Sequence, residues 1–352
     1  MSTAVATAAG SVVRPSGLRV RWMVGGILAA VATAIAGMVV GPVSVPPLDV
    51  VKELLGIDAG LTAQQVAIVE QIRLPRVVLG LLVGATLSLC GASYQGVFRN
   101  PLADPYLLGA AAGAGLGVTI VIVGTSAGSA TPGAAPLAAF VGALGAVALS
   151  YLLGASSGGR TSTASLILAG VAVASFLTAV QTYVQQRNQD TIRQVYAWLL
   201  GRLSIAGWDD VFLLLPYAVV TWVVLLANRR TLDVLAVGDE EAASLGLNPR
   251  RSRLVVIVFA SLGTAAAVSV SGLIAFVGII VPHTVRLLAG RSHRVVLPLS
   301  LLLGGAFLCL ADLAARTLAS PAEIPIGVVT AFFGAPFFVL VLRSSRRMGM
   351  TA

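Results

Sequence analysis

The sequence predicts an all-α polytopic membrane protein with about ten transmembrane helices per subunit. Of its 352 residues, 57% are hydrophobic and only 11% are charged, whereas a soluble domain carries roughly 25% charged residues. The mean hydropathy is +0.94. Charge-free stretches recur along the whole chain, and a helix needs about 20 mainly apolar residues to cross a bilayer. Composition and segment length therefore indicate the same fold class.

The N-terminal part predicts a cytoplasmic tail and a first span. Residues 1–21 are small, polar and basic, and residues 22–40 are uncharged and long enough to cross the membrane. A signal peptide cleaved near the Ala-Ile-Ala sequence at 34–36 is the alternative. We expect a retained helix, because the apolar run exceeds the typical signal-peptide core of about 7–15 residues and more spans follow.

Four more spans are expected in the first half of the chain. Residues 41–76 have a mixed composition and predict one or two short amphipathic helices outside the membrane. A run rich in Gly, Ala, Ser and Pro at 124–136 divides the next long uncharged stretch. Spans two to five are expected at 77–97, at 105 to about 124, at about 136–159 and at 161–186.

Five further spans are expected in the second half, after a second external helix at 191–201. These spans six to ten cover residues 211–228, 254–271, 272–290, 295–311 and 324–342. Gly272 is expected to break the chain between spans seven and eight, because the uncharged run there is short for two full spans. The ten-span domain then covers residues 22–343, and residues 344–352 form a basic cytoplasmic tail.

The charge distribution predicts the topology of these spans. With both termini in the cytoplasm, 16 of the 23 basic residues lie on the cytoplasmic side, as the positive-inside rule requires. A five-span offset relates spans two to five to spans seven to ten. Because an odd offset reverses direction, the sequence predicts an inverted repeat with a transport path between its halves.

The segment 229–253 is the only long, densely charged stretch between two spans. Its acidic run Asp239, Glu240 and Glu241 is followed by a short helical pattern that Gly246 ends. Arginines on both flanks place this helix in the cytoplasm. Two interpretations stay open at this stage: a docking surface for a soluble partner, or a solvated loop that only connects two spans.

Several function classes are excluded by residue content. The single lysine, Lys52, follows Val51, so the chain lacks the Gly-Lys-Ser/Thr of a Walker A loop and another polypeptide must bind any ATP. No carboxylate pair or metal cluster suggests an enzyme. The net charge of +9 does not indicate nucleic-acid binding, because the basic residues are dispersed at helix ends. Within the spans only Asp312 comes close to the membrane interior, and it is at ion-pair spacing from Arg316. Ion-coupled carriers usually keep carboxylates or histidines at membrane depth, so their absence argues against such a carrier.

A series of long motifs resembles the FecCD family of permeases, which serve importers of iron-siderophores, haem and cobalamin. The longest motif is QIRLPRVVLGLLVGATLSLCGASYQGVFRNPLADPYLLG at 71–109. The others are LILAGVAV (166–173), YAWLLGRLS (196–204), GDEEAASLG (238–246), GLIAFVGIIVPHTVRLLAG (272–290) and EIPIGVVTAFFGAPFF (323–338). The resemblance runs from about residue 70 to 343, in the family's order.

The resemblance implies the permease subunit of an ATP-binding-cassette importer in a bacterial cytoplasmic membrane. Such a permease pairs with a second permease subunit, in a homodimer or a heterodimer. Two cytoplasmic ATPases bind ATP-Mg and drive it, and an extracytoplasmic binding protein delivers the solute; this chain itself is expected to hold no cofactor. A ferric siderophore is the expected solute because it is the commonest assignment in the family. Haem or cobalamin is the alternative, and a passive or ion-coupled protein without an ATPase is the competing class.

The resemblance also implies roles for individual residues. Coupling to the ATPase falls to Asp239, Glu240, Glu241, Ser244, Leu245 and Gly246, in the cytoplasmic coupling loop 229–253. Docking of the binding protein falls to Arg73, Arg76 and Arg316, for which ordinary anchoring at the membrane interface is the alternative. The gate of the translocation path is expected at Asn100, Leu102, Ser162 and Thr163. Asn100 could instead only form the turn, because Asn-Pro is a strong turn sequence.

Overall fold

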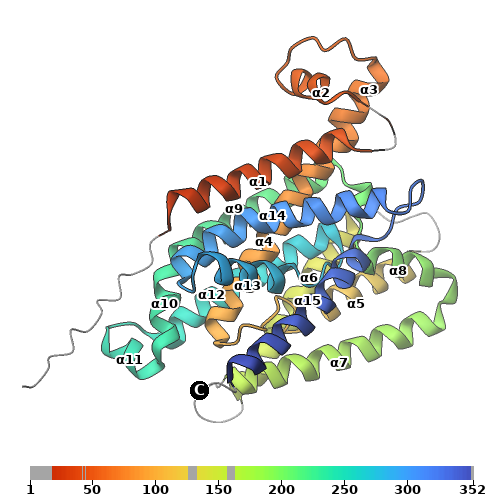
Figure 1. The fold of residues 1–352 in the computed structure, drawn as a ribbon. Helices are drawn as coiled ribbons and strands as arrows, with labels where there is room; N and C mark the ends of the chain where they lie inside the picture. The colour runs from red at the N-terminus through yellow and green to blue at the C-terminus, as the bar shows by residue number, and fades with distance from the viewer. Residues whose placement is uncertain (1–17, 42, 44, 126–132, 157–162, 350–352) are drawn as a thin grey trace, which may run out of the picture.

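The computed structural model describes residues 18–41, 43, 45–125, 133–156 and 163–349, and these form a bundle of helices without a strand (Figure 1). Within them, seven helices are long and apolar enough to cross a membrane, and three shorter apolar helices accompany them. The prediction of an all-α polytopic protein with about ten spans is confirmed.

The helices follow the predicted order. The apolar helices of the first half are α1 (Val20–Val39), α4 (Leu74–Phe98), α5 (Ala110–Gly124), α6 (Ala134–Ser156) and α7 (Thr163–Arg187). Those of the second half are α9 (Trp208–Ala227), α12 (Pro249–Ser271), α13 (Val277–Ala289), α14 (His293–Thr317) and α15 (Ile326–Gly349). The short helices between them are α2 (Pro47–Leu54), α3 (Ala63–Ala67), α8 (Ile192–Leu199), α10 (Arg229–Val237) and α11 (Asp239–Ser244).

The centre of the bundle is α4, which is buried along nearly its whole length and packs against α12, α13 and α14. Two of its glycines allow this close approach. A Cβ atom on Gly84 would lie 2.3 Å from the carbonyl oxygen of Gly304, and one on Gly91 would lie 2.2 Å from that of Gly278. Since neither contact tolerates a side chain, small residues here permit backbone-to-backbone packing of helices.

The second span begins earlier than predicted. Residues 63–98 form one continuous helical segment in which α3 passes through a π-helical turn, η1 (Ile68–Arg73), into α4. Pro75 is tolerated because the π turn directly before it already changes the helical hydrogen bonds that a proline would interrupt. Arg73 and Arg76 therefore lie on the helix rather than before it. Hydrogen-bond partners inside the protein compensate their charges.

Spans three and eight are shorter than predicted, and in both a non-helical stretch precedes the helix. Residues 105–109 and 272–276 are not helical, although both stretches are uncharged. The residue before each helix has a left-handed backbone: Gly109 at φ +82° before α5, and Phe276 at φ +69° before α13. Gly272, where the break was predicted, ends α12 at φ +71°. A five-span offset pairs α5 with α13, so these two interrupted spans support the predicted inverted repeat.

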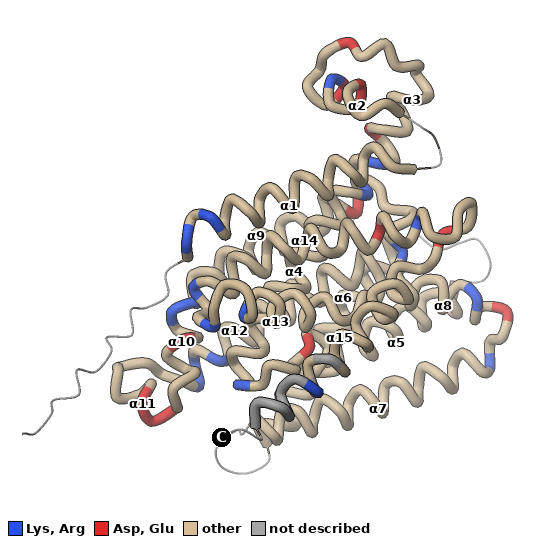
Figure 2. The backbone as a smooth tube through the Cα atoms, in the orientation of Figure 1, with Lys and Arg blue, Asp and Glu red and all other residues tan. Residues whose placement is uncertain are grey.

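The last two spans extend beyond their predicted ends. Helix α14 continues through Asp312 and Arg316 to Thr317, and α15 continues through the predicted tail to Gly349. The start of α1, the end of α15 and the pair α10–α11 lie at one end of the bundle, whereas α2 and α3 project from the opposite end (Figure 1). Arginines gather at the α10–α11 end (Figure 2).

Candidate functional site

Helix α11 presents the predicted coupling residues to solvent. Asp239, Glu240, Glu241, Ser244, Leu245 and Gly246 are all exposed, and Leu245 is 69% exposed. Between them Ala242 is fully buried and anchors the helix. Gly246 adopts φ +83° just after the helix, which fits its predicted role as a stop. The segment thus offers a polar surface with one large apolar side chain at its end.

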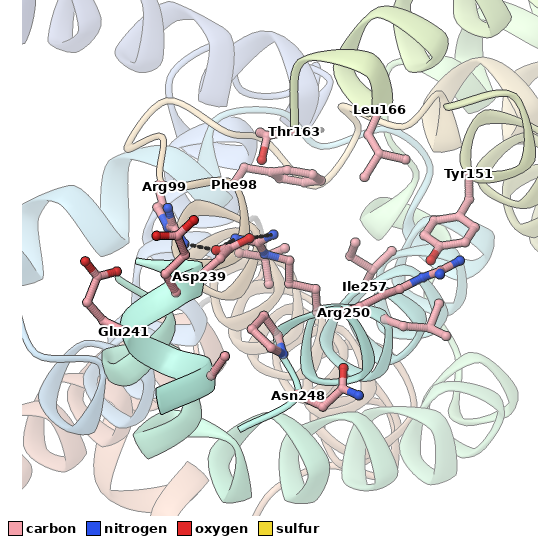
Figure 3. Close-up of a pocket in the computed structure, with 16 residues that line it drawn as sticks. Phe98, Arg99, Tyr151, Thr163, Leu166, Asp239, Glu241, Asn248, Arg250 and Ile257 are labelled. Carbon is pink, nitrogen blue, oxygen red and sulfur yellow. Dashed lines mark hydrogen bonds and ion pairs between the residues drawn. The ribbon is translucent and has the colours of Figure 1, made fainter. Parts of the chain in front are cut away.

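Asp239 fixes α11 to two of the apolar helices. Arg253 of α12 donates hydrogen bonds from its two terminal nitrogens to the Asp239 carboxylate, at 2.8 and 2.5 Å. Arg99, directly after α4, forms an ion pair with the same carboxylate and donates from Nε to the Leu235 carbonyl at 2.8 Å (Figure 3). Partial burial alone would raise the pKa of Asp239, but the hydrogen bonds and charges of Arg253 and Arg99 outweigh it, so this pKa is lowered.

Asp233 fixes α10 to the start of α14 in the same way. Its carboxylate accepts hydrogen bonds from the Ser292 hydroxyl at 2.7 Å and from the His293 backbone N–H at 2.6 Å. The His293 ring nitrogen Nδ1 lies 2.9 Å away. Partial burial would raise the pKa of Asp233, but the hydrogen bonds from His293 and Ser292 lower it on balance. Sequence reasoning missed this pair, because nothing in the spacing of the two residues relates them.

A cavity of about 810 Å³ lies beside α11, between the ends of α4, α6, α7 and α12 (Figure 3). Of the predicted gate residues, Thr163 lines this cavity, and Leu102 is exposed outside it. The Asn100 side chain accepts a hydrogen bond from the Leu102 backbone N–H at 2.9 Å, so Asn100 does form the turn. Ser162 lies outside the described residues, and the gate roles stay predictions.

The three predicted docking arginines lie at the opposite end of the bundle, and all of them are buried. Arg76 donates to Asp312 at 2.8 Å and to both carboxylate oxygens of Glu323 at 3.0 Å. Arg316 lies 3.6 Å from Asp312, which confirms the ion pair predicted from their spacing. Arg73 donates to the carbonyls of residues 38 and 39 at 2.7 and 3.0 Å. The arginines thus hold α1, α4 and α14 together here, and their docking role stays a prediction.

The two interrupted spans meet inside the bundle. The Gln95 side chain of α4 donates to the carbonyl of Gly278 at 3.0 Å, and the Tyr106 hydroxyl donates to that of Ile274 at 2.9 Å. The Tyr106 bond joins the loop before α5 to the loop before α13, and the Gln95 bond joins α4 to the first turn of α13. Both satisfy carbonyls at membrane depth that otherwise lack a partner, that of Ile274 in the break and that of Gly278, because Pro282 has no N–H to donate to it.

A bundle of apolar spans, two of them interrupted, with an exposed helix held on a charged connection, has the architecture of a membrane transport protein. The chain belongs to the FecCD transport family, whose model matches residues 27–344. It is 48% identical to the cobalamin import system permease protein BtuC of Halobacterium salinarum, over 80% of this chain and 74% of that protein. It is also 41% identical to the hemin transport system permease protein HmuU of Yersinia pestis, over 77% and 82% of the two chains.

The fold matches a solved transporter. An ABC transporter described as metal-chelate type, in an inward-facing conformation, superposes with a TM-score of 0.82 at 29% sequence identity. The match covers 93% of this chain and 100% of the solved chain. The predicted family and fold class are therefore confirmed.

Proposed function

We propose that this chain is the permease subunit of an ATP-driven importer of a large metal chelate, with a ferric siderophore as the first candidate solute. The observation that carries the proposal is the exposed face of α11, which is joined through Asp239 to α4 and α12. A soluble ATPase that moves α11 would move these two spans with it. Movement of spans against each other around a central path is how transporters of this kind alternate access.

The partners follow from the same proposal. Two ATPases bind at the α10–α11 end, which faces the cytoplasm because arginines gather there (Figure 2). A second permease subunit, most simply a copy of this chain, covers the apolar side chains that α7 and α15 expose, such as Phe176, Phe332 and Phe333. An extracytoplasmic binding protein docks at the opposite end, in a bacterial cytoplasmic membrane.

At that end, Arg76 takes part in docking, and its surface partner Glu323 has to be displaced first. The Arg76 side chain is only 8% exposed, whereas that of Glu323 is 36% exposed and accepts hydrogen bonds from both terminal nitrogens of the guanidinium. A carboxylate of the binding protein that pairs with Arg76 must therefore take the place of Glu323. Arg73 and Arg316 have no comparable surface neighbour among their described contacts, so they contribute to docking by holding Arg76 and its helix in place.

Cobalamin is the second candidate solute, because a cobalamin permease is among the relatives with high identity. Uptake of radioiron-loaded siderophore, labelled cobalamin and labelled haem, in a deletion strain with and without this gene, separates the candidates. Rescue of iron-siderophore uptake alone is the expected result. Rescue of cobalamin or haem uptake keeps the importer and replaces the solute. ATP-independent uptake of any of them would overturn the proposal.

A further inference from the structure

The cavity beside α11 has two chemically different ends. At one end Asp239 is already shared by Arg99 and Arg253. At the other end Arg250 extends toward Tyr151, away from that ion pair (Figure 3). Arg250 makes no ion pair with any residue in the described part of the chain. A cation thus faces the cavity without a counter-charge on its own side.

The arginine at the other end of the cavity has no donor free for a ligand. Both terminal nitrogens of Arg253 bind Asp239, but its Nε–H is buried and finds no acceptor among the described residues. Since this nitrogen has almost no exposed surface, a ligand in the cavity does not reach it. Glu240 and Glu241 border the cavity on the α11 side, and Figure 3 shows Glu241 directed away from Arg250. Among the arginines that line the cavity, Arg250 is thus the one without a carboxylate partner in the described residues.

The remaining wall of the cavity is apolar. It is formed by Val97, Phe98, Leu166, Leu254 and Ile257. Leu254 is 38% exposed, and Val258, one turn further along α12, is 49% exposed. The apolar wall therefore continues out of the cavity along α12 to the surface of a helix that spans the bilayer. A soluble anion would leave this wall uncovered, whereas a lipid chain would cover it.

We propose that this cavity binds one anionic phospholipid, with its phosphate at Arg250 and the first part of an acyl chain along Leu254 and Ile257. Arginine forms strong charge-assisted hydrogen bonds with phosphate oxygens. A volume of about 810 Å³ lies in the range of ligand sites. The inference does not depend on which solute is transported.

Native mass spectrometry of the full-length permease with its co-purifying subunits tests the proposal. The complex is exchanged into phosphatidylglycerol or phosphatidylcholine, and retained lipid is counted. Arg250→Gln is expected to lower retained phosphatidylglycerol about tenfold without changing phosphatidylcholine. Arg251→Gln is the matched control: it removes the same charge one residue away, at an exposed position that does not line the cavity. Equal loss in both variants would show general surface attraction and overturn the site, as would unchanged retention in Arg250→Gln.

A second variant tests the acyl-chain part without touching a charge. Ile257→Trp fills the apolar wall and is expected to reduce retained phosphatidylglycerol as Arg250→Gln does, with thermal unfolding confirming that both variants are folded. Addition of inorganic phosphate or glycerol 3-phosphate distinguishes the source of the phosphate. If either displaces the retained lipid at equimolar concentration, or if Ile257→Trp retains it fully, the cavity binds soluble anions and the lipid proposal is wrong.

Discussion

The Asp239 cluster and the Asp312 cluster use the same chemistry at opposite ends of the bundle. In each, one carboxylate is shared by two arginines: Arg99 and Arg253 for Asp239, and Arg76 and Arg316 for Asp312. They differ in burial, because the Asp239 side chain is 47% exposed and that of Asp312 is 5% exposed. Water can replace either partner of Asp239, whereas it cannot reach Asp312. The Asp239 cluster can therefore open and close, so it suits a contact between helices that move. The Asp312 cluster suits a contact that keeps its helices in place.

The largest effect is expected when the buried cluster loses its carboxylate. Asp312→Ala leaves the Arg316 guanidinium buried without its counter-charge and Arg76 with Glu323 alone. Breaking a buried pair in this way costs about 3–5 kcal/mol, so the melting temperature of the purified protein should fall by many degrees. Asp190→Ala, at an exposed position of the same end, should change the free energy of unfolding by less than about 0.5 kcal/mol. Similar melting temperatures for both variants would contradict the holding role.

A large effect on assembly, without an effect on stability, is expected at the exposed face of α11. Glu240→Arg together with Glu241→Arg reverses the charge of the proposed docking surface, so the amount of ATPase that co-purifies should fall at least about tenfold. The melting temperature should stay unchanged, since both side chains are exposed. Glu70→Arg with Asp209→Arg makes the same charge change near the opposite end and should keep the ATPase bound. Retention of the ATPase by the α11 variant would contradict the docking role.

A smaller effect is expected when the exposed cluster loses its charge. Asp239→Asn should cost about 1 kcal/mol or less, as is usual for exposed ion pairs, and the ATPase should still bind. Because α11 is then held less firmly to α4 and α12, less solute should be transported for each ATP hydrolysed in proteoliposomes. Glu70→Gln, at an exposed position near the opposite end, is the control, and it should leave this ratio unchanged. If Asp239→Asn transports as much solute for each ATP hydrolysed as the wild type does, the Asp239 ion pairs do not contribute to coupling.

The smallest effect is a pH dependence to which the partly exposed carboxylates of Asp239 and Asp233 contribute. The pKa values of Asp239 and Asp233 are lowered from 3.8 in the folded protein, so their stabilisation is fully present above that pH. It is lost as the pH falls through the lower folded-state values. Thermal unfolding at pH 5 and at pH 3 should therefore show a smaller decrease for Asp239→Asn than for the wild type. An identical decrease would mean that the ion pair does not persist in solution.

The sequence predicted those parts of the fold that depend on apolar content. Ten spans, the external helix near 191–201, the short helix before Gly246 and the break at Gly272 all appear where long uncharged runs or glycine placed them. The predicted span boundaries were wrong where a charged residue was taken to mark the end of a span. Arg76, Asp312 and Arg316 lie on buried helix surfaces, because each compensates the charge of another that is distant in sequence or one turn away.

The candidate site was predictable only in part. Exposure of α11 followed from its composition, but its attachment did not, since Asp239 and Arg99 are separated by 140 positions. The loop before α5 was expected to be helical because it is uncharged, yet a left-handed Gly109 and the hydrogen bond of Tyr106 to Ile274 keep it open. Contacts of this kind depend on tertiary packing and leave no local pattern.

The glycine contact between α4 and α14 limits how this subunit can change shape. With Gly84 and Gly304 in backbone contact, and Arg76 bridging the same two helices at one end, the pair behaves as a single rigid plate. A rearrangement that exchanges access between the two sides of the membrane then has to keep this plate intact. Because α4 is joined to α11 through Arg99 and Asp239, a displacement of α11 moves α4 and α14 together.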